Sequence, residues 1–237
     1  MIVAADGDRL RFVTQPDHAR LAGELVRLWR TDGLPDHPRR DELLFAVREH
    51  DNGWREADAA PRVDAPTGRP ADFLAFPPAE RREVWRRSTA RYAATHPYAA
   101  LLITEHALAL LADREGGAEG TAFLAALADR RLELQLATRV GAEELAADYR
   151  FLQLADGIAL AACAGWREPF ERAGMRVEAR DSGLLLRPFP LTGSTTFKVP
   201  CRSIPDRRYQ GDADLGGTLA AARWEEFSVR VAALESG

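Results

Sequence analysis

Cysteine is scarce in this sequence, which contains only Cys163 and Cys201. Two isolated cysteines exclude a disulfide framework and a paired-cysteine zinc site. Apolar stretches long enough to cross a bilayer are also lacking, and the first residues turn acidic too soon for a secretory leader. These absences predict a soluble, cytoplasmic protein without a membrane partner.

Lysine is almost absent, because Lys198 is the only lysine among 32 basic residues. There are 36 acidic residues, so the net charge is 32 − 36 = −4, and no basic face for nucleic acid is expected. A P-loop and a Gly-x-Ser-x-Gly elbow are missing too, since segment 191–196 contains glycine and hydroxyls but no P-loop lysine. The expected partner is a small-molecule substrate, and a homodimer is left open.

Regular elements can be placed from the periodicity of apolar residues. Residues 1–14 are predicted to form a β-hairpin, and helical periodicity then dominates residues 15–165. Within that part, five prolines in segment 55–78 predict an irregular loop of the kind that forms a lid or pocket wall. Residues 166–237 change to short strand-like runs, with one turn at residues 181–183. The predicted fold is mainly α, an all-α core with a small antiparallel β appendage built from the hairpin and the C-terminal third.

Histidine and aspartate occur in an order typical of metal ligands. The dipeptide His50-Asp51 is expected where a helix ends, and Asn52-Gly53 follows it as a stop that tolerates the left-handed conformation. Both side chains of the dipeptide can then reach one ion, or two neighbouring ions. Another helix carries Asp156 inside an apolar run, where a carboxylate is costly to bury unless it is paired or binds a metal.

Together with His18 and His106 on two further helices, these residues predict a buried site for one or two divalent ions. Imidazole and carboxylate suit Fe, Mn or another transition metal. Each residue also has an ordinary interpretation. A single histidine is more often an unremarkable polar residue, and Asp156 could lie on the wet face of its helix.

The ordered set resembles the HD-domain superfamily, whose metal-dependent members are named after the His-Asp dipeptide. Segments 46–53 and 151–157 are similar to its His-Asp motif and to its final-helix Asp motif. The chain is more closely similar to a bacterial family catalogued only as a domain of unknown function. The stretches that carry this second resemblance are 15–18, 50–54, 67–73 and 98–106.

The first resemblance implies an HD-like helical bundle over residues 15–165. The ligands it implies are His18, His50, Asp51 and Asp156, with His106 as an added ligand and His96 as a further candidate. It implies a hydrolase that acts on a small phosphorylated molecule through a metal-bound hydroxide. A dinuclear iron oxygenase and a non-catalytic, metal-stabilised binding or sensor module are the alternatives. His96 could equally be a capping or loop residue, because it precedes the proline that starts a helix.

One position departs from the HD pattern, because Trp54 stands where many hydrolytic members have a phosphate-binding lysine. An arginine could replace that cation, since its guanidinium binds phosphate or carboxylate through two hydrogen bonds. The candidate substrate-pocket residues are Gln15, Trp54, Arg55 and Arg69. Besides Asp51, the candidate catalytic groups for proton transfer are Glu105 and Asp58, although solvated carboxylates are the commoner case.

Overall fold

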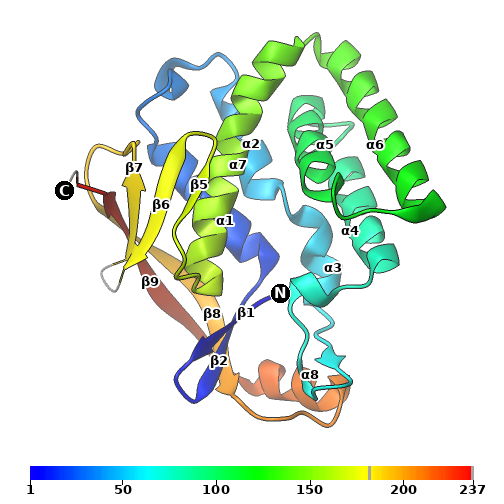
Figure 1. Ribbon diagram of the computed structural model, residues 1–237, viewed down its shortest axis with the longest axis vertical. Coiled ribbons are helices and arrows are strands. Elements are labelled where there is room, and N and C mark those ends of the chain that lie inside the picture. Colours follow the sequence, from blue (N-terminus) through cyan, green and yellow to red (C-terminus); the bar gives the residue numbers. More distant parts are fainter. Residues whose placement is uncertain (181–182, 236–237) are drawn as a thin grey trace.

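The computed structural model describes residues 1–180 and 183–235 of the 237-residue chain. A curled sheet of seven strands forms a half-barrel, and the helices pack against it and beside it (Figure 1). Its strand order is β1-β2-β8-β9-β7-β6-β5. These strands are β1 (Ile2–Asp6), β2 (Arg9–Val13), β5 (Phe170–Arg172), β6 (Met175–Arg180), β7 (Gly183–Arg187), β8 (Thr195–Pro205) and β9 (Trp224–Ala233).

Helices make up about half of the chain. The α-helices are α1 (Gln15–Leu28), α2 (Arg40–Glu49), α3 (Arg55–Asp58), α4 (Pro78–Ala90), α5 (Pro97–Leu111), α6 (Gly117–Thr138), α7 (Ala142–Ala164) and α8 (Asp212–Ala221). The 3-10 turns are η1 (Leu34–Asp36), η2 (Asn52–Trp54) and η3 (Phe73–Ala75). None of the helices in the described ranges is long and apolar enough to cross a membrane.

The predicted fold class, mainly α with a small antiparallel β appendage, is wrong, and so is the description of the protein as all-α. Strand β2 pairs with β8, so the hairpin and the C-terminal third belong to one continuous seven-stranded sheet. The sheet is not wholly antiparallel either, because β7 runs parallel to β9. Strands β8 and β9 are long because they pair with each other along most of their length, although they lie apart in the sequence. The apolar pattern of each strand alone predicted only short strands, because it does not record the partner.

Segment 55–78, predicted to be irregular, consists mainly of turns with short pieces of structure. It contains α3, η3 and a two-stranded ladder of β3 (Val63–Asp64) with β4 (Arg69–Pro70). Phe73 and Phe76 from this segment pack their rings against Trp54. The turn predicted at residues 181–183 lies largely outside the described residues.

The main core lies between the sheet and the helices α1, α2, α5 and α7. Trp29, directly after α1, and Leu152 of α7 are fully buried there, together with Leu186 of β7 and Val231 of β9. Because α1 and α7 both pack on the sheet, their positions relative to each other are fixed by the β layer. This arrangement determines where the candidate ligands on these two helices meet.

Candidate metal centre

Helix α1 presents His18 from its first turn. Thr14 caps this helix, since its side-chain oxygen accepts a hydrogen bond from the Asp17 amide at 3.1 Å. The ring of His18 is buried, and its Nε2 lies 3.3 Å from the backbone carbonyl oxygen of Asp156. A carbonyl oxygen only accepts, so Nε2 carries the hydrogen, and Nδ1 is left facing Oδ2 of Asp51 at 3.4 Å.

The dipeptide His50-Asp51 follows directly after the last residue of α2. Nδ1 of His50 lies 2.7 Å from the carbonyl oxygen of Val47 and donates its hydrogen to it. Nε2 of the same ring therefore points to the centre of the site, where Oδ2 of Asp51 and Oδ1 of Asp156 each lie 3.4 Å away. A backbone carbonyl thus fixes both the tautomer and the orientation of His50, as is common for metal-ligating histidines.

Gly53 holds this dipeptide against α4, by a different device from the one predicted. Neither Asn52 nor Gly53 has a positive φ, so the expected left-handed stop is absent. Instead, a Cβ atom at Gly53 would lie 2.2 Å from the carbonyl oxygen of Val84 and 2.4 Å from Oγ of Ser88. The Gly53 amide donates a hydrogen bond to that Oγ at 3.0 Å. Glycine is therefore required for the close approach of two backbones just after the dipeptide.

Helices α5 and α7 supply the remaining groups. Nε2 of His106 lies 3.9 Å from Oδ2 of Asp156, and its Nδ1 lies 3.2 Å from the hydroxyl of Tyr149. The rings of His106 and His50 meet edge to face, with centroids 5.2 Å apart. Asp156 is thus surrounded by histidines from three separate segments of the chain.

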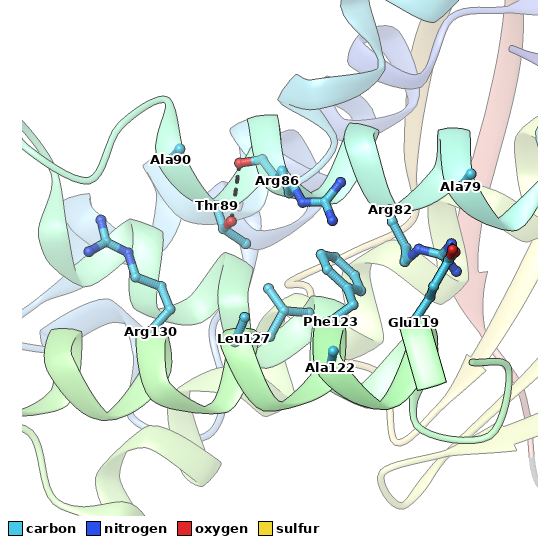
Figure 2. Close-up of a pocket in the computed structure, with 11 residues that line it drawn as sticks. Ala79, Arg82, Arg86, Thr89, Ala90, Glu119, Ala122, Phe123, Leu127 and Arg130 are labelled. Atoms are coloured by element: carbon cyan, nitrogen blue, oxygen red, sulfur yellow. Dashed lines mark hydrogen bonds and ion pairs between the residues drawn. The ribbon is translucent and has the colours of Figure 1, made fainter. Parts of the chain in front are cut away.

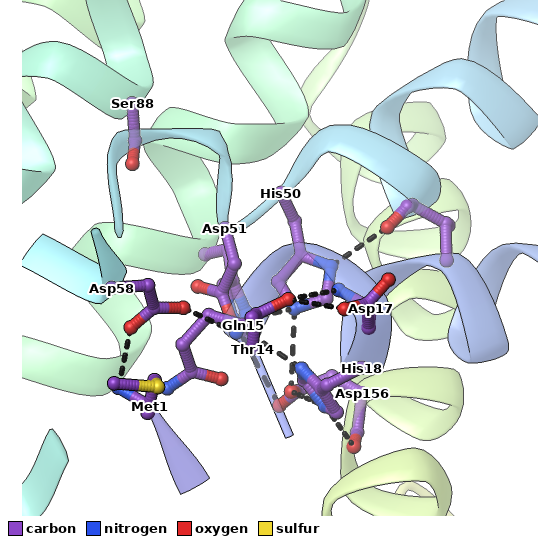
Figure 3. Close-up of polar contacts among 12 residues, drawn as sticks. Met1, Thr14, Gln15, Asp17, His18, His50, Asp51, Asp58, Ser88 and Asp156 are labelled. Atoms are coloured by element: carbon purple, nitrogen blue, oxygen red, sulfur yellow. Dashed lines mark hydrogen bonds and ion pairs between the residues drawn. The ribbon is translucent and has the colours of Figure 1, made fainter. Parts of the chain in front are cut away.

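The ligand atoms form two overlapping groups, in each of which all atoms lie within 4.8 Å of one another. His18, His50 and Asp51 make one group, and His50, His106 and Asp156 make the other. Figure 3 shows His18, His50, Asp51 and Asp156 pointing toward one another from their different elements. We call His18, His50, Asp51, His106 and Asp156 together the His/Asp cluster.

Two nitrogens of the cluster, Nδ1 of His18 and Nε2 of His50, have no hydrogen-bond partner in the part of the chain that the structure describes. In neutral rings each would aim a lone pair at carboxylate oxygens, which is unfavourable unless a cation lies between them. Without a metal, that cation can only be a proton. Burial disfavours protonation, but the contacts with Asp156 and Asp51 outweigh it and raise the pKa of His18 to about 9, and they raise the pKa of His50 as well.

A divalent ion satisfies the same requirement. Atoms bound to one ion at about 2.1 Å in tetrahedral geometry are about 3.4 Å apart. The unprotonated nitrogens lie at this distance from carboxylate oxygens, since Nδ1 of His18 is 3.4 Å from Asp51 and Nε2 of His50 is 3.4 Å from both Asp51 and Asp156. His106 suits a ligand too, because burial lowers its pKa to about 4 and keeps the ring neutral. The donor set could therefore hold a metal ion.

A cavity of about 210 Å³ opens beside the His/Asp cluster, with His18, Asp51, His106 and Asp156 in its wall. Its other walls are largely apolar and aromatic. They include Phe73, Leu74, Trp85, Leu110, Leu160 and Trp166. The irregular segment 55–78 contributes part of the mouth through Phe73 and Leu74, and Leu74 is 56% exposed. The proline-rich segment therefore forms one wall of this cavity.

Two of the predicted pocket residues line this cavity and two do not. Gln15 is buried in its wall, and its Oε1 has no hydrogen-bond partner among the described residues. Trp54 lines the cavity while also packing in a small aromatic core. Arg55 and Arg69 do not line the cavity. Arg55 forms an ion pair with Glu49, and Arg69 forms one with Asp206.

Three further candidates lie outside the described cluster. His96 precedes α5 and stacks on Phe45, with ring centroids 3.9 Å apart. Glu105 neighbours His106 in the sequence but faces α6, where it pairs with Arg131 at 3.3 Å. Helical geometry explains both placements, because His96 is about 15 Å along the helix from His106 and adjacent residues point about 100° apart.

Asp58 is buried close to the cluster but has other partners. Its carboxylate accepts a hydrogen bond from the Gln15 amide at 2.6 Å and pairs with the amino group of Met1. Burial is the main cause of the raised pKa of this carboxyl group, and the charge of Asp51 adds to it. Asp58 therefore contributes to the position of Gln15 in the cavity wall.

Sequence reasoning missed three arginines in the same wall, Arg81, Arg114 and Arg172. It also missed Tyr149, the partner of His106. The chain has 32 − 1 = 31 arginines, so no single one stands out in the sequence. Arg172 lies on β5, in the part that was predicted to be an appendage.

A larger cavity of about 750 Å³ lies between α4 and α6 (Figure 2). Its floor contains Phe123 and Leu127, and arginines lie along its rim. Arg82 on that rim is already paired, since its guanidinium lies 2.6 Å from Glu119. None of the residues predicted as ligands or pocket residues lines it, so the cavity beside the His/Asp cluster is the better candidate site.

Fold and site together define a mixed helix-and-sheet protein with a buried histidine–aspartate cluster that could hold a metal ion. The chain belongs to the DUF3891 family, described as "Protein of unknown function", whose sequence profile matches residues 1–206. This confirms the expected membership of a family of unknown function, and the matched range contains the whole cluster. Comparisons with curated proteins and with solved structures give no match.

Proposed function

We propose that this protein is a metal-dependent hydrolase that acts on a small phosphorylated molecule. One observation carries the proposal: three imidazoles and two carboxylates from separate helices converge beside a cavity. The order of these residues, which resembles the HD-domain superfamily, supports the same conclusion. The room beside the cluster favours an enzyme over a non-catalytic binding module.

Each residue of the cluster has a defined part in this proposal. His18, His50, Asp51 and Asp156 would hold one ion, and His106 would extend the set toward a second. When bound, a divalent ion polarises a phosphoryl oxygen and lowers the pKa of a water molecule toward neutrality. The carbonyl of Val47 orients His50, and Gly53 keeps the dipeptide in place against α4.

A dinuclear iron oxygenase is the second candidate. Two ligand groups that share His50 favour it, because such an arrangement accommodates a pair of ions. The absence of a lysine after the His-Asp-x-Gly motif, where Trp54 stands, favours it too. The arginines in the cavity wall favour the hydrolase, because guanidinium groups bind phosphate.

The test is metal analysis of anaerobically purified protein, followed by hydrolysis of p-nitrophenyl phosphate with added Mn²⁺. Hydrolysis is expected in the wild type and should be abolished by Asp51→Ala, which removes a central carboxylate. Asp129→Ala, at an exposed aspartate of α6, is the matched control and should retain activity. A protein that binds Mn²⁺ but hydrolyses no phosphate ester would contradict the proposal, and two irons with a mixed-valent signal would select the oxygenase.

A further inference from the structure

Three guanidinium groups meet in the wall of the 210 Å³ cavity, from three separate places in the fold. Arg81 comes from α4, Arg114 follows α5, and Arg172 comes from β5 at the edge of the sheet. Arg172 lies closest to the His/Asp cluster, since its Nη1 is 3.7 Å from Oδ2 of Asp156. Arg172 also packs beside Gly157, where a Cβ would be in ordinary van der Waals contact with Cδ and Nη1 of Arg172 at 3.5 Å.

The positive charge of these arginines is only partly compensated. Arg81 is 3.5 Å from Glu115, which pairs more closely with Arg82 at 2.9 Å, and Nε of Arg81 is buried without a hydrogen-bond partner. Arg114 is exposed at the mouth and forms no ion pair with a described residue. The acidic groups that line the cavity are Asp51 and Asp156, which both face histidines, and Asp156 also compensates part of the charge of Arg172 at 3.7 Å. The wall is therefore prepared to receive an anion.

The size and lining of the cavity limit the organic group to which the bound anion can be attached. About 210 Å³ corresponds to about seven waters of about 30 Å³ each, below the range of about 300 to 1,000 Å³ for pockets that hold drug-sized ligands. Trp85, Leu110 and Leu160 give the interior an apolar surface. Apart from the cluster and the arginines, Gln15 is the polar side chain in this wall, which is too few groups to recognise a sugar and a base.

We propose that Arg81, Arg114 and Arg172 bind the phosphate of a compact monoester whose organic part is apolar and no larger than one aromatic ring. The cavity accordingly excludes nucleotides. This inference rests on the proposed hydrolase function. In the reaction, an oxygen of water bonds to phosphorus, the bond from phosphorus to the ester oxygen breaks, and that oxygen takes a proton from the water. Inorganic phosphate and an alcohol or phenol result, without any oxidation or reduction.

Two measurements on the full chain loaded with Mn²⁺ test this inference: hydrolysis of p-nitrophenyl phosphate against AMP, and calorimetric binding of inorganic phosphate. We expect hydrolysis of the aryl ester only. Arg172→Gln and Arg114→Gln should each raise the KM for p-nitrophenyl phosphate by about tenfold or more. Each should also raise the Kd of inorganic phosphate by about tenfold or more. Arg114→Gln removes no contact with the cluster, so this variant should retain metal content and kcat.

The matched control is Arg27→Gln, because this exposed arginine of α1 pairs with Glu24 and does not line the cavity. It should leave KM and Kd unchanged. Equal hydrolysis of AMP, or arginine variants with an unchanged phosphate Kd, would overturn the inference while leaving the hydrolase in place. A protein that binds phosphate through these arginines but hydrolyses no monoester would instead support the anion site and contradict the proposed function.

Discussion

Stripping the metal from this protein should make its stability fall as the pH rises above neutrality. Without an ion, a second proton on the ring of His18 must separate its Nδ1 from Oδ2 of Asp51, since Nε2 already carries a hydrogen directed at Asp156. Burial opposes that proton, yet the hydrogen bonds and charges of the two carboxylates raise the pKa to about 9, from an ordinary value of 6.5. A group whose pKa is higher in the folded state stabilises the fold fully below its unfolded pKa, and the contribution is lost as the pH rises through the folded pKa.

The expected size of the effect follows from the shift. The difference of 9 − 6.5 = 2.5 pH units corresponds to about 3 kcal/mol at 1.36 kcal/mol per unit. His50 is raised in the same direction, so its contribution has the same sign. The pKa values of Asp51 and Asp156 are lowered, so their contribution is lost only in acid, outside this pH window.

Urea denaturation in EDTA at pH 6.5, 8 and 9.5 measures this, with wild type and His18→Gln compared at each pH. The wild type should lose at least about 3 kcal/mol of unfolding free energy across this range, and His18→Gln should lose about 3 kcal/mol less, because only His50 still titrates in the cluster. The N-terminal amine and other groups titrate in both proteins, so the difference isolates His18. With saturating Mn²⁺ the decline should disappear, because the ion replaces the proton. Equal losses in the two metal-free proteins would refute the account of the cluster.

Two further substitutions test the groups that hold the ligands. Gly53→Ala should lower the unfolding free energy by about 2 to 3 kcal/mol, because its methyl group would overlap the carbonyl oxygen of Val84. Gly193→Ala, where a Cβ meets nothing within 4 Å, is the control, and equal melting temperatures for the two variants would contradict this reasoning. Tyr149→Phe should weaken metal binding about tenfold, since Nδ1 of His106 loses its hydrogen-bond partner. An unchanged metal Kd in a titration would show that this contact does not orient the ligand.

The helices and the residues that come together in the His/Asp cluster could be predicted because the signals for both are local. Apolar periodicity marks α1, α2 and α4 to α7, and a carboxylate among aliphatic residues, as at Asp156, is costly enough to indicate a partner. Gly53 shows the limit of such signals. The sequence predicts a left-handed helix stop there, which is wrong, and glycine is required instead by the approach of α4, which no local pattern records.

The sheet could not be predicted from local signals, because its pairings join distant segments. Arg9 of β2 pairs with Pro205 of β8, and Leu184 of β7 pairs with Val231 of β9, which runs parallel to it as a strand. Each strand is stabilised by its neighbours rather than by its own propensity. Helix α8 was also missed, because Gly216 and Gly217 lie inside it and glycine disfavours helices.

This error matters for function, because the sheet forms part of the candidate site. Strand β5 is the edge strand, and it turns back along α7 so that Arg172 reaches Asp156 from a position 16 residues later in the chain. Trp166, in the connection between α7 and β5, lines the same cavity. The helical segment 15–165 alone would therefore keep the cluster's residues but lose one cation and one wall of the cavity. It would also expose the faces of α1 and α7 that bury Leu186 and Val231 of the sheet, so the ligands on these two helices depend on the β layer for their positions.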